Sequence, residues 1–392
     1  MEKEKYISAP LITREEAIKA LEFCTGQILG RLPTFTEKFQ SSCSKNLFYQ
    51  PVENKGWTSS FWTGEIWLAY EYSKDEALKK AALVQCDSFY HRIKDRIATG
   101  DHDLGFLYTL SCVAGYKITG EEKAKEAALE AAEHLMRLYS PFGKFIRTWG
   151  EEPVEPERFE MIIDCLLNIP LFYWASEVTG NKKYREAAVQ HFLTTYRNAL
   201  REDGLSHQAM LFDINTGELL NYHTHQGYKD ESAWSRGQAW AIYGPAITYK
   251  YTGMKECLDM FKRACDYFMN HLPDDMIPYF DLTFTEGEEW PRDSSAATIA
   301  ACGMLEMAKY LSQEEAEKYT RYAKQIMKSL FENCRVKNCT ESNGLLMHGT
   351  YCCKTPFNTQ ETDRGVDECC SFGDYFYMEA LMRLVTDWKM YW

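Results

Sequence analysis

The 392-residue sequence predicts an all-α fold: one domain, residues 1–392, built as a closed (α/α)6 barrel of six helix pairs. Three observations predict it. Six segments share one plan, in which a small or acidic start leads into an apolar helix, a short turn and a second helix. The second helix of each pair is charged on one side only, which is typical of an outer layer around an apolar inner ring. The turns between paired helices also resemble one another.

The individual helix pairs follow this plan closely. Residues 164–177 read DCLLNIPLFYWASE and predict an inner helix, whereas residues 121–128 read EEKAKEAA and predict the start of an outer one. Thr-Gly ends three of the turns, and glycine fits the left-handed position that follows a helix. The six repeats begin near Trp62, Asp103, Asp164, Arg236, Asp293 and Gly373.

Two other helical arrangements compete with the closed barrel, namely an open solenoid and a pair of helical lobes. The spacing between repeats is unequal, whereas open solenoids have more regular repeat lengths. Residues 139–160 and 201–235 form long links rich in glycine, proline and aromatic residues. Links of this length in a compact domain are usually functional. We expect them to lie as loops at one rim, beside the first residues of the inner helices.

Composition excludes several functional classes. A net charge of −13 argues against a nucleic-acid partner, since phosphate binding needs clustered Lys and Arg. No apolar run is long enough to span a membrane, and none follows the charged N-terminus, so we expect a cytoplasmic protein. The 14 cysteines include no CxxC pair, and Cys334 and Cys339 are spaced unlike zinc ligands. They predict small buried side chains and no structural metal.

Polar residues at the starts of the inner helices are candidates for chemistry, because all six would point into one funnel. Each carboxylate among them also has an ordinary explanation as a helix cap. The helix-cap explanation fits Asp164 least well, because its neighbours are apolar and predict a buried carboxyl group. Burial raises the pKa of a carboxyl group. Asp103 is the candidate second carboxylate that would raise it further, as suits a proton donor. The six positions are Glu65, Asp103, Asp164, Arg236, Asp293 and Asp374.

The link before the fourth repeat holds the densest cluster of candidate binding residues. Arg236 suits an anionic group through its planar fork, although a salt bridge to a neighbouring inner-helix carboxylate explains it equally well. Gln226 offers hydrogen bonds to hydroxyl groups, and Trp234 and Trp240 offer flat surfaces for sugar rings.

Other rim positions give weaker signals. His207 and Trp149 lie on separate links, and a lone histidine is more often structural than catalytic. A metal site built from Asp101, His102 and Asp103 conflicts with the geometry of a helix start, where successive side chains point in different directions.

The sequence resembles the unsaturated glucuronyl hydrolases, glycoside hydrolase family 88, over nearly its whole length. The most specific segments are HDLGFLY from His102, IIDCLLNIPLFYWA from Ile162 and SAWSRGQAW from Ser232. The resemblance implies an (α/α)6 barrel that uses no metal or cofactor, with Asp103 and Asp164 as its paired aspartates. It implies sugar-binding roles for Trp57, Trp149, His207, Gln226, Trp234, Arg236 and Trp240.

The same resemblance implies a reaction. The partner would be an anionic oligosaccharide, sulfated or unsulfated, that carries a 4,5-unsaturated uronic acid at its non-reducing end. Asp164 would protonate C4 and activate a water that adds at C5, and the resulting hemiketal would open and release the remaining sugar. Asp103 would hold ring hydroxyls and tune Asp164. The sequence leaves open which glycosaminoglycan is preferred.

Three other functions remain open at this stage: an unsaturated rhamnogalacturonyl hydrolase, an amino-sugar epimerase, and a non-catalytic sugar-binding toroid on the same fold. The epimerase would need several central histidines, for which His207, His223 and His225 are the candidates. Residues 354–364 form a polar link beside the last inner helix. Within it, Lys354 and Arg364 are candidates to meet a sulfate, although exposed loop charges are more often simply solvated.

Overall fold

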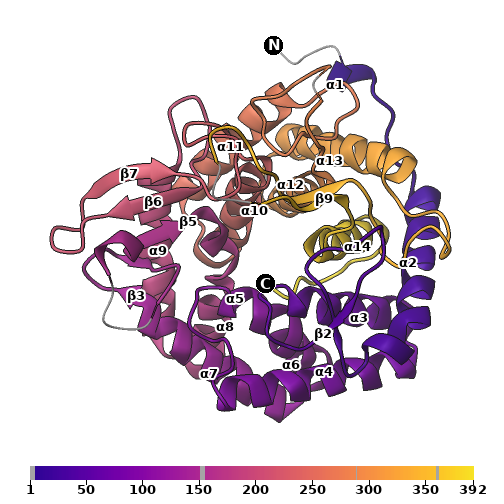
Figure 1. The fold of residues 1–392 in the computed structure, drawn as a ribbon, viewed down its shortest axis with the longest axis horizontal. Coiled ribbons are helices and arrows are strands. Elements are labelled where there is room, and N and C mark those ends of the chain that lie inside the picture. The colour runs from indigo at the N-terminus through magenta and orange to yellow at the C-terminus, as the bar shows by residue number, and fades with distance from the viewer. Residues whose placement is uncertain (1–4, 151–154, 288, 359–361) are drawn as a thin grey trace.

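The computed structural model describes residues 5–150, 155–287, 289–358 and 362–392, and it has two concentric rings of helices (Figure 1). Neighbouring inner helices contact one another around the ring, and α14 returns to contact the first of them, α3. The predicted (α/α)6 barrel is confirmed. The inner ring consists of α3 (Ser59–Ser73), α5 (Leu104–Tyr108) with α6 (Ala114–Thr119), α8 (Pro170–Thr179), α10 (Ser235–Thr252), α12 (Ser294–Met307) and α14 (Ser371–Val385).

The outer ring covers the inner one, and its first helix completes the last pair. The N-terminal α2 packs against the C-terminal α14, so the two ends of the chain close the barrel together (Figure 1). A capping box of Thr13 and Glu16 starts α2. The outer helices are α2 (Arg14–Phe35), α4 (Glu76–Lys94), α7 (Glu122–Leu138), α9 (Lys182–Ala199), α11 (Lys255–His271) and α13 (Gln313–Asn333); a short α1 (Lys5–Ser8) precedes them.

The Thr-Gly turns end inner helices as the sequence predicts. Gly120, Gly180 and Gly253 follow α6, α8 and α10 with φ angles of 75°, 71° and 66°. Residues with a Cβ rarely adopt this left-handed conformation, which explains glycine at all three positions.

Two inner helices are irregular close to the predicted aspartates. The prediction of a continuous helix from Asp164 is wrong for its first residues. Ile163–Leu167 forms a 3-10 turn, and α8 begins only at Pro170. Proline has no N–H to donate and is favoured in the first turn of a helix, so α8 starts there. In the second repeat a π-helical turn, Thr109–Val113, separates α5 from α6.

The long links were expected to be loops, but parts of them pair as antiparallel strands. β5 (Glu160–Ile162), β6 (Ala209–Phe212) and β7 (Leu219–His223) form a three-stranded sheet with Ile162 opposite Ala209 and Ala209 opposite His223. Such pairing depends on tertiary contacts between distant segments, which a local pattern does not reveal. The remaining pairs are β1 (Phe39–Gln40) with β2 (Pro51–Val52), β3 (Tyr139–Ser140) with β4 (Phe145–Ile146), and β8 (Gly349–Cys352) with β9 (Arg364–Glu368).

The interior of the barrel is filled by large side chains, including the last residue of the chain. The fully buried Trp392 stacks on Phe376 and donates a hydrogen bond from Nε1 to Glu379 Oε2 at 2.9 Å. The cysteines are free thiols and nearly all are buried, as predicted; Cys339 is exposed and Cys43 is partly so. Within the described residues, no helix combines the length and the apolar character that crossing a membrane requires.

Candidate active site

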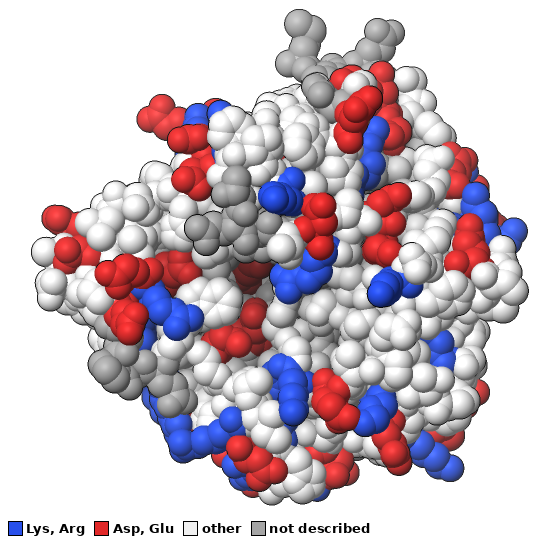
Figure 2. Space-filling view, viewed as in Figure 1, with Lys and Arg blue, Asp and Glu red and all other residues white. Residues whose placement is uncertain are grey.

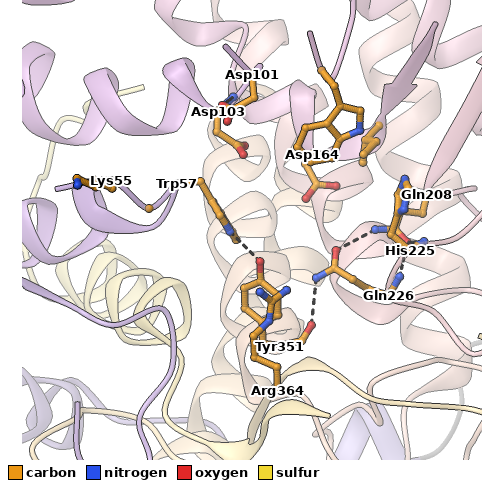
Figure 3. Close-up of a pocket in the computed structure, with 13 residues that line it drawn as sticks. Lys55, Trp57, Asp101, Asp103, Asp164, Gln208, His225, Gln226, Tyr351 and Arg364 are labelled. Carbon is orange, nitrogen blue, oxygen red and sulfur yellow. Dashed lines mark hydrogen bonds between the residues drawn. The ribbon is translucent and has the colours of Figure 1, made fainter. Parts of the chain in front are cut away.

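A cavity of about 410 Å³ opens where the first residues of the inner helices meet the links (Figure 3). The carboxyl groups of Asp103 and Asp164 point into the same space, with Trp57 beside them (Figure 3). The cavity therefore combines acids with aromatic and amide side chains, which suits a sugar. Its lining consists of Lys55, Gly56, Trp57, Asp101, Asp103, Trp149, Ile162, Asp164, Gln208, His225, Gln226, Tyr351 and Arg364.

The six polar residues predicted at the helix starts do not all share this cavity. Asp103 and Asp164 line it, whereas Glu65 is buried with its Oε2 3.4 Å from Nη2 of Arg31. Asp374 accepts backbone N–H groups from residues 345 and 346, at 2.9 and 2.8 Å. The prediction that all six side chains point into one cavity is therefore wrong. The first residues of an inner helix can also face a neighbouring segment of the barrel.

Asp164 sits on the 3-10 turn before α8, where the two flanking residues, Ile163 and Cys165, are fully buried. Its own side chain is partly exposed to the cavity, and its Oδ1 has no hydrogen-bond partner within the described chain. Burial raises the pKa of the Asp164 carboxyl to about 6, against the opposing effects of Arg236, His225 and Trp240. The group therefore changes protonation close to neutral pH, as a general acid/base must.

Asp103 lies directly before α5, and its backbone N–H donates to Asp101 Oδ1 at 3.1 Å. Burial raises the pKa of Asp103 well above its usual range, and the nearby carboxylates of Asp101 and Asp164 raise it further. The repulsion between the paired aspartates thus acts on Asp103, whereas the sequence predicted that it would act on Asp164. In its protonated form, which the raised pKa favours, Asp103 can donate a hydrogen bond and adds no negative charge to the cavity.

The backbones that carry these aspartates are in direct contact. A Cβ atom added to Gly105, on α5, would lie 2.2 Å from the backbone of Asn168, just after the 3-10 turn of Asp164. Asn168 also accepts the backbone N–H of Phe106 through Oδ1, at 2.7 Å. Only glycine allows this approach, so residue 105 helps to fix the two carboxyl groups relative to each other.

One wall of the cavity comes from the links. Trp149 donates a hydrogen bond from Nε1 to Glu160 Oε1 at 2.5 Å. Burial alone would raise the pKa of Glu160, but hydrogen bonds from His223 and His225 outweigh it and lower the pKa to about 2. Glu160, His223 and His225 are also the residues whose geometry could hold a metal ion. Within the described structure, no metal-binding geometry is found for the set considered from the sequence, Asp101, His102 and Asp103. The His102 ring is buried, and burial lowers its pKa to about 4.

An adjoining part of the lining is a hydrogen-bonded set around Tyr351, on β8. Trp57 Nε1 donates to its hydroxyl at 2.8 Å, and Gln226 Nε2 donates to its backbone carbonyl at 3.1 Å (Figure 3). Gln226 Oε1 in turn accepts from Gln208 Nε2 at 2.9 Å. These contacts hold Trp57 and Gln226 with their exposed parts toward the cavity.

The remaining predicted binding residues lie behind these walls. The guanidinium group of Arg236 is buried, 2.6 Å from Asp293 Oδ2, and it donates to the carbonyls of Thr350 and Tyr351, each at 2.8 Å. Of the two interpretations of Arg236, the salt bridge to an inner-helix carboxylate is the one that the structure shows. Trp234 is buried with its ring 4.5 Å from the guanidinium carbon of Arg236.

Trp240 and His207 complete the set of predicted positions. Trp240 is fully buried beside Asp164 and packs against Phe106 and Phe376. The buried ring of His207 stacks on Tyr222 at 3.7 Å, and burial lowers its pKa to about 4.

Basic groups stand at the mouth of the cavity. Lys55 and Arg364 are both exposed and line it, and the guanidinium carbon of Arg364 lies 3.8 Å from the centre of the Tyr351 ring. Figure 2 shows acidic atoms deep in the hollow of this face and basic side chains beside it. Lys354 is exposed nearby, but residues 359–361 of the predicted 354–364 segment lie outside the described structure.

Among the polar side chains of the lining, three were not predicted as candidate site residues: Lys55, Gln208 and Tyr351. Gln208 immediately follows His207, and Tyr351 lies on a strand that the sequence did not predict. Lys55 precedes the predicted Trp57 by two residues. Lys55 and Gln208 could therefore have been found from their closeness in sequence to predicted binding residues, whereas Tyr351 could not.

Two carboxyls of raised pKa in a cavity lined by aromatic and amide side chains fit a glycosidase, and the comparisons with known proteins assign the chain to that class. Residues 33–263 match the family model described as Glycosyl Hydrolase Family 88. An "unsaturated chondroitin disaccharide hydrolase" of Streptococcus agalactiae serotype III (strain NEM316) is 42% identical, covering 99% of this chain and 96% of the relative. An "unsaturated glucuronyl hydrolase" of Bacillus sp. (strain GL1) is 36% identical, covering 94% and 97%. The chain belongs to glycoside hydrolase family 88.

Solved structures agree with this assignment. The crystal structure of unsaturated glucuronyl hydrolase from Streptococcus agalactiae superimposes with a TM-score of 0.94 at 42% identity, covering 99% of this chain and 96% of that one. A variant of that enzyme with an aspartate replaced by asparagine, complexed with dGlcA-GalNAc6S, gives 0.86 at 40% identity with the same coverage. The Bacillus enzyme gives 0.87 at 34% identity, covering 95% and 97%.

Proposed function

We propose that the protein, as a single catalytic domain, removes the 4,5-unsaturated uronic acid from the non-reducing end of glycosaminoglycan oligosaccharides made by lyases. The observation that carries this proposal is the Asp164 carboxyl, whose pKa is raised to about 6 and which faces a cavity walled by Trp57 and Trp149. The printed names of the relatives, which refer to unsaturated chondroitin disaccharides and to glucuronyl groups, support this substrate class. A cytoplasmic location suits it, because small lyase products are imported before the final cleavage.

The reaction is the hydration of a vinyl ether. Protonated Asp164 gives its proton to C4, and the resulting carboxylate takes a proton from the water that adds at C5. Asp164 is thereby restored, and the hemiketal opens and releases the remaining sugar. A pKa near 6 suits both steps, because the same group must donate and accept a proton near neutral pH. Since the attack is not at C1, the separation of the two carboxyls does not determine a stereochemical outcome.

Asp103 is assigned a supporting role. Burial and the nearby carboxylates raise its pKa and so favour the protonated form, which donates a hydrogen bond to a ring hydroxyl and is a poor nucleophile. A neutral Asp103 also lowers the electrostatic repulsion that a uronate would meet beside Asp164 and Asp101. Arg236 acts on the site through the backbone of Tyr351, whose carbonyl it holds.

The charge at the mouth of the cavity supports an anionic substrate. Lys55 and Arg364 are exposed basic residues that line the cavity, and a guanidinium pairs well with a sulfate or carboxylate. We infer a preference for sulfated disaccharides over unsulfated ones. Exposed cations contribute modestly and are screened by salt, so the preference should shrink as ionic strength rises.

The test is a substrate panel with wild-type protein and Asp164→Asn. Unsaturated disaccharides from hyaluronan, chondroitin, sulfated chondroitin and heparin are incubated with each, and the ultraviolet absorbance of the conjugated double bond is followed. Loss of absorbance with wild type alone supports the reaction and the role of Asp164. Activity of Asp164→Asn within tenfold of the wild-type value refutes the mechanism. If only an unsaturated rhamnogalacturonan fragment reacts, the protein is the rhamnogalacturonyl hydrolase; if nothing reacts but sugars bind, it is a binding protein.

A further inference from the structure

Glu160, His223 and His225 form a compact cluster on the cavity wall that the proposed chemistry does not use. His223 Nε2 lies 2.7 Å from Glu160 Oε2, and His225 Nε2 lies 3.5 Å from Glu160 Oε1. The three candidate ligand atoms all lie within 4.8 Å of one another. The two imidazole rings are 4.9 Å apart and nearly perpendicular, so they approach the carboxylate from two directions.

The three-stranded sheet explains why these side chains converge. Glu160 begins β5 and His223 ends β7, on either side of β6. The register places Ile162, Ala209 and His223 opposite one another, and Glu160 shares their face because it is two residues from Ile162. The small side chain of Ala209 leaves room for contact across the middle strand. The backbone N–H of His225 is held by Gln208 Oε1 at 2.9 Å, which fixes the third member.

The donor set is one that transition metals prefer. Two imidazole nitrogens and one carboxylate bind zinc and its neighbours in proteins, with an open coordination position left for another ligand. Bonds of about 2.0–2.2 Å place such ligand atoms about 3–3.5 Å apart, close to the distances between Glu160 and the two histidines.

We propose that Glu160, His223 and His225 bind a divalent transition-metal ion such as Zn²⁺ or Co²⁺, and that this ion inhibits the enzyme. Inhibition follows from the contacts that coordination displaces. Glu160 is the hydrogen-bond acceptor of Trp149, and His225 lines the cavity together with Trp149. An ion bound between Glu160 and His225 would compete with Trp149 for Glu160 Oε1 and would place a positive charge at the cavity lining. The binding half rests on geometry alone, whereas the inhibition half also rests on the proposed function.

Binding is tested with Co²⁺, whose visible absorption reports its ligands, added to tag-free protein. Wild type is expected to bind one ion through nitrogen and oxygen. Glu160→Gln and His223→Gln should each weaken binding at least tenfold, since even an outer-shell change costs about 10–100-fold. His348→Ala is the matched control, because His348 pairs with Asp367 at 2.6 Å on the surface and should not matter. The partly exposed His223 is the second variant in case loss of the buried Glu160 disturbs folding.

Two results would overturn the site. Binding of equal strength in wild type and His223→Gln would place the ion elsewhere. So would the intense near-ultraviolet absorption of thiolate-bound cobalt, which would assign the ion to one of the cysteines.

Inhibition is then measured by the ultraviolet assay with and without Co²⁺, followed by addition of a chelator. Wild type should lose activity and recover it, and His223→Gln should resist the ion. Binding without inhibition would refute the second half of the proposal. If no disaccharide is hydrolysed yet Co²⁺ binds as described, the proposed function fails and the metal site stands.

Discussion

Replacing Asp164 by asparagine should greatly reduce catalysis and stabilise the folded protein at alkaline pH. Burial raises the pKa of this carboxyl from its ordinary value of 3.8 to about 6. Above pH 6 the folded protein must therefore keep an ionised group in surroundings that disfavour it. Asparagine has nearly the same shape and no charge, so the substitution removes that unfavourable term along with the transferable proton.

The magnitude follows from the change in pKa. A carboxyl shifted from 3.8 to about 6 opposes folding by about 3 kcal/mol at any pH above both values. The cavity side of Asp164 is partly exposed to water, so we expect a gain of about 1–3 kcal/mol. The size of the gain depends on pH: the raised pKa leaves stability intact below about pH 4, and stability is lost as pH rises from about 4 to 6. The gain in Asp164→Asn should thus be full at pH 8 and nearly absent at pH 4.

The assay is urea unfolding of wild type and variant at pH 4 and pH 8, together with the disaccharide assay at pH 6. Activity should fall by about 10²–10⁴-fold, the usual contribution of a general acid/base. Asp213→Asn is the matched control, because backbone hydrogen bonds from Thr216 and Asn215 lower the pKa of that exposed carboxyl. It should show no gain at pH 8. An equal stability difference for Asp164→Asn at both pH values would refute the assignment of a buried, high-pKa acid.

Three further predictions test the cavity independently. The value of kcat/KM should fall as pH rises through about 6, because Asp164 loses the proton that it donates; a flat profile from pH 5 to 8 would contradict that role. Gly105→Ala should destabilise the protein by about 1–3 kcal/mol and lower activity, because its Cβ would overlap backbone, whereas Gly26→Ala, with open space around it, should not; thermal unfolding measures both. Arg364→Gln should raise KM for a sulfated disaccharide more than for an unsulfated one, by an amount that shrinks in high salt, while Lys354→Gln, outside the cavity lining, serves as its control.

The ring of helices was predictable because its determinants are local. Apolar and one-sided helices alternate along the chain, and glycine at 120, 180 and 253 marks where three inner helices end. The environment of Asp164 was predictable for the same reason, since Ile163 and Cys165 beside it are apolar and become fully buried. Burial is also the main cause of its raised pKa.

Side-chain direction was much less predictable. A polar residue at the start of an inner helix can face the cavity or the next helix, and the sequence pattern is the same in both cases. Asp164 faces the cavity, whereas Asp293 faces Arg236, which had itself been predicted to bind substrate. The sheet β5–β6–β7 was missed because its strands come from separate links and are recognisable only once paired.

The site has two parts, which come from different segments of the chain. The inner helices and the turns before them supply the acids, Asp103 and Asp164, and close backbone contact at Gly105 fixes the spacing of the two. The links supply the surfaces that meet the sugar, among them Trp149 and Tyr351. A change in the links therefore alters which sugar is held while the proton chemistry is retained. By this reasoning, substitutions in the links should act mainly on KM, and substitutions at the helix starts mainly on kcat.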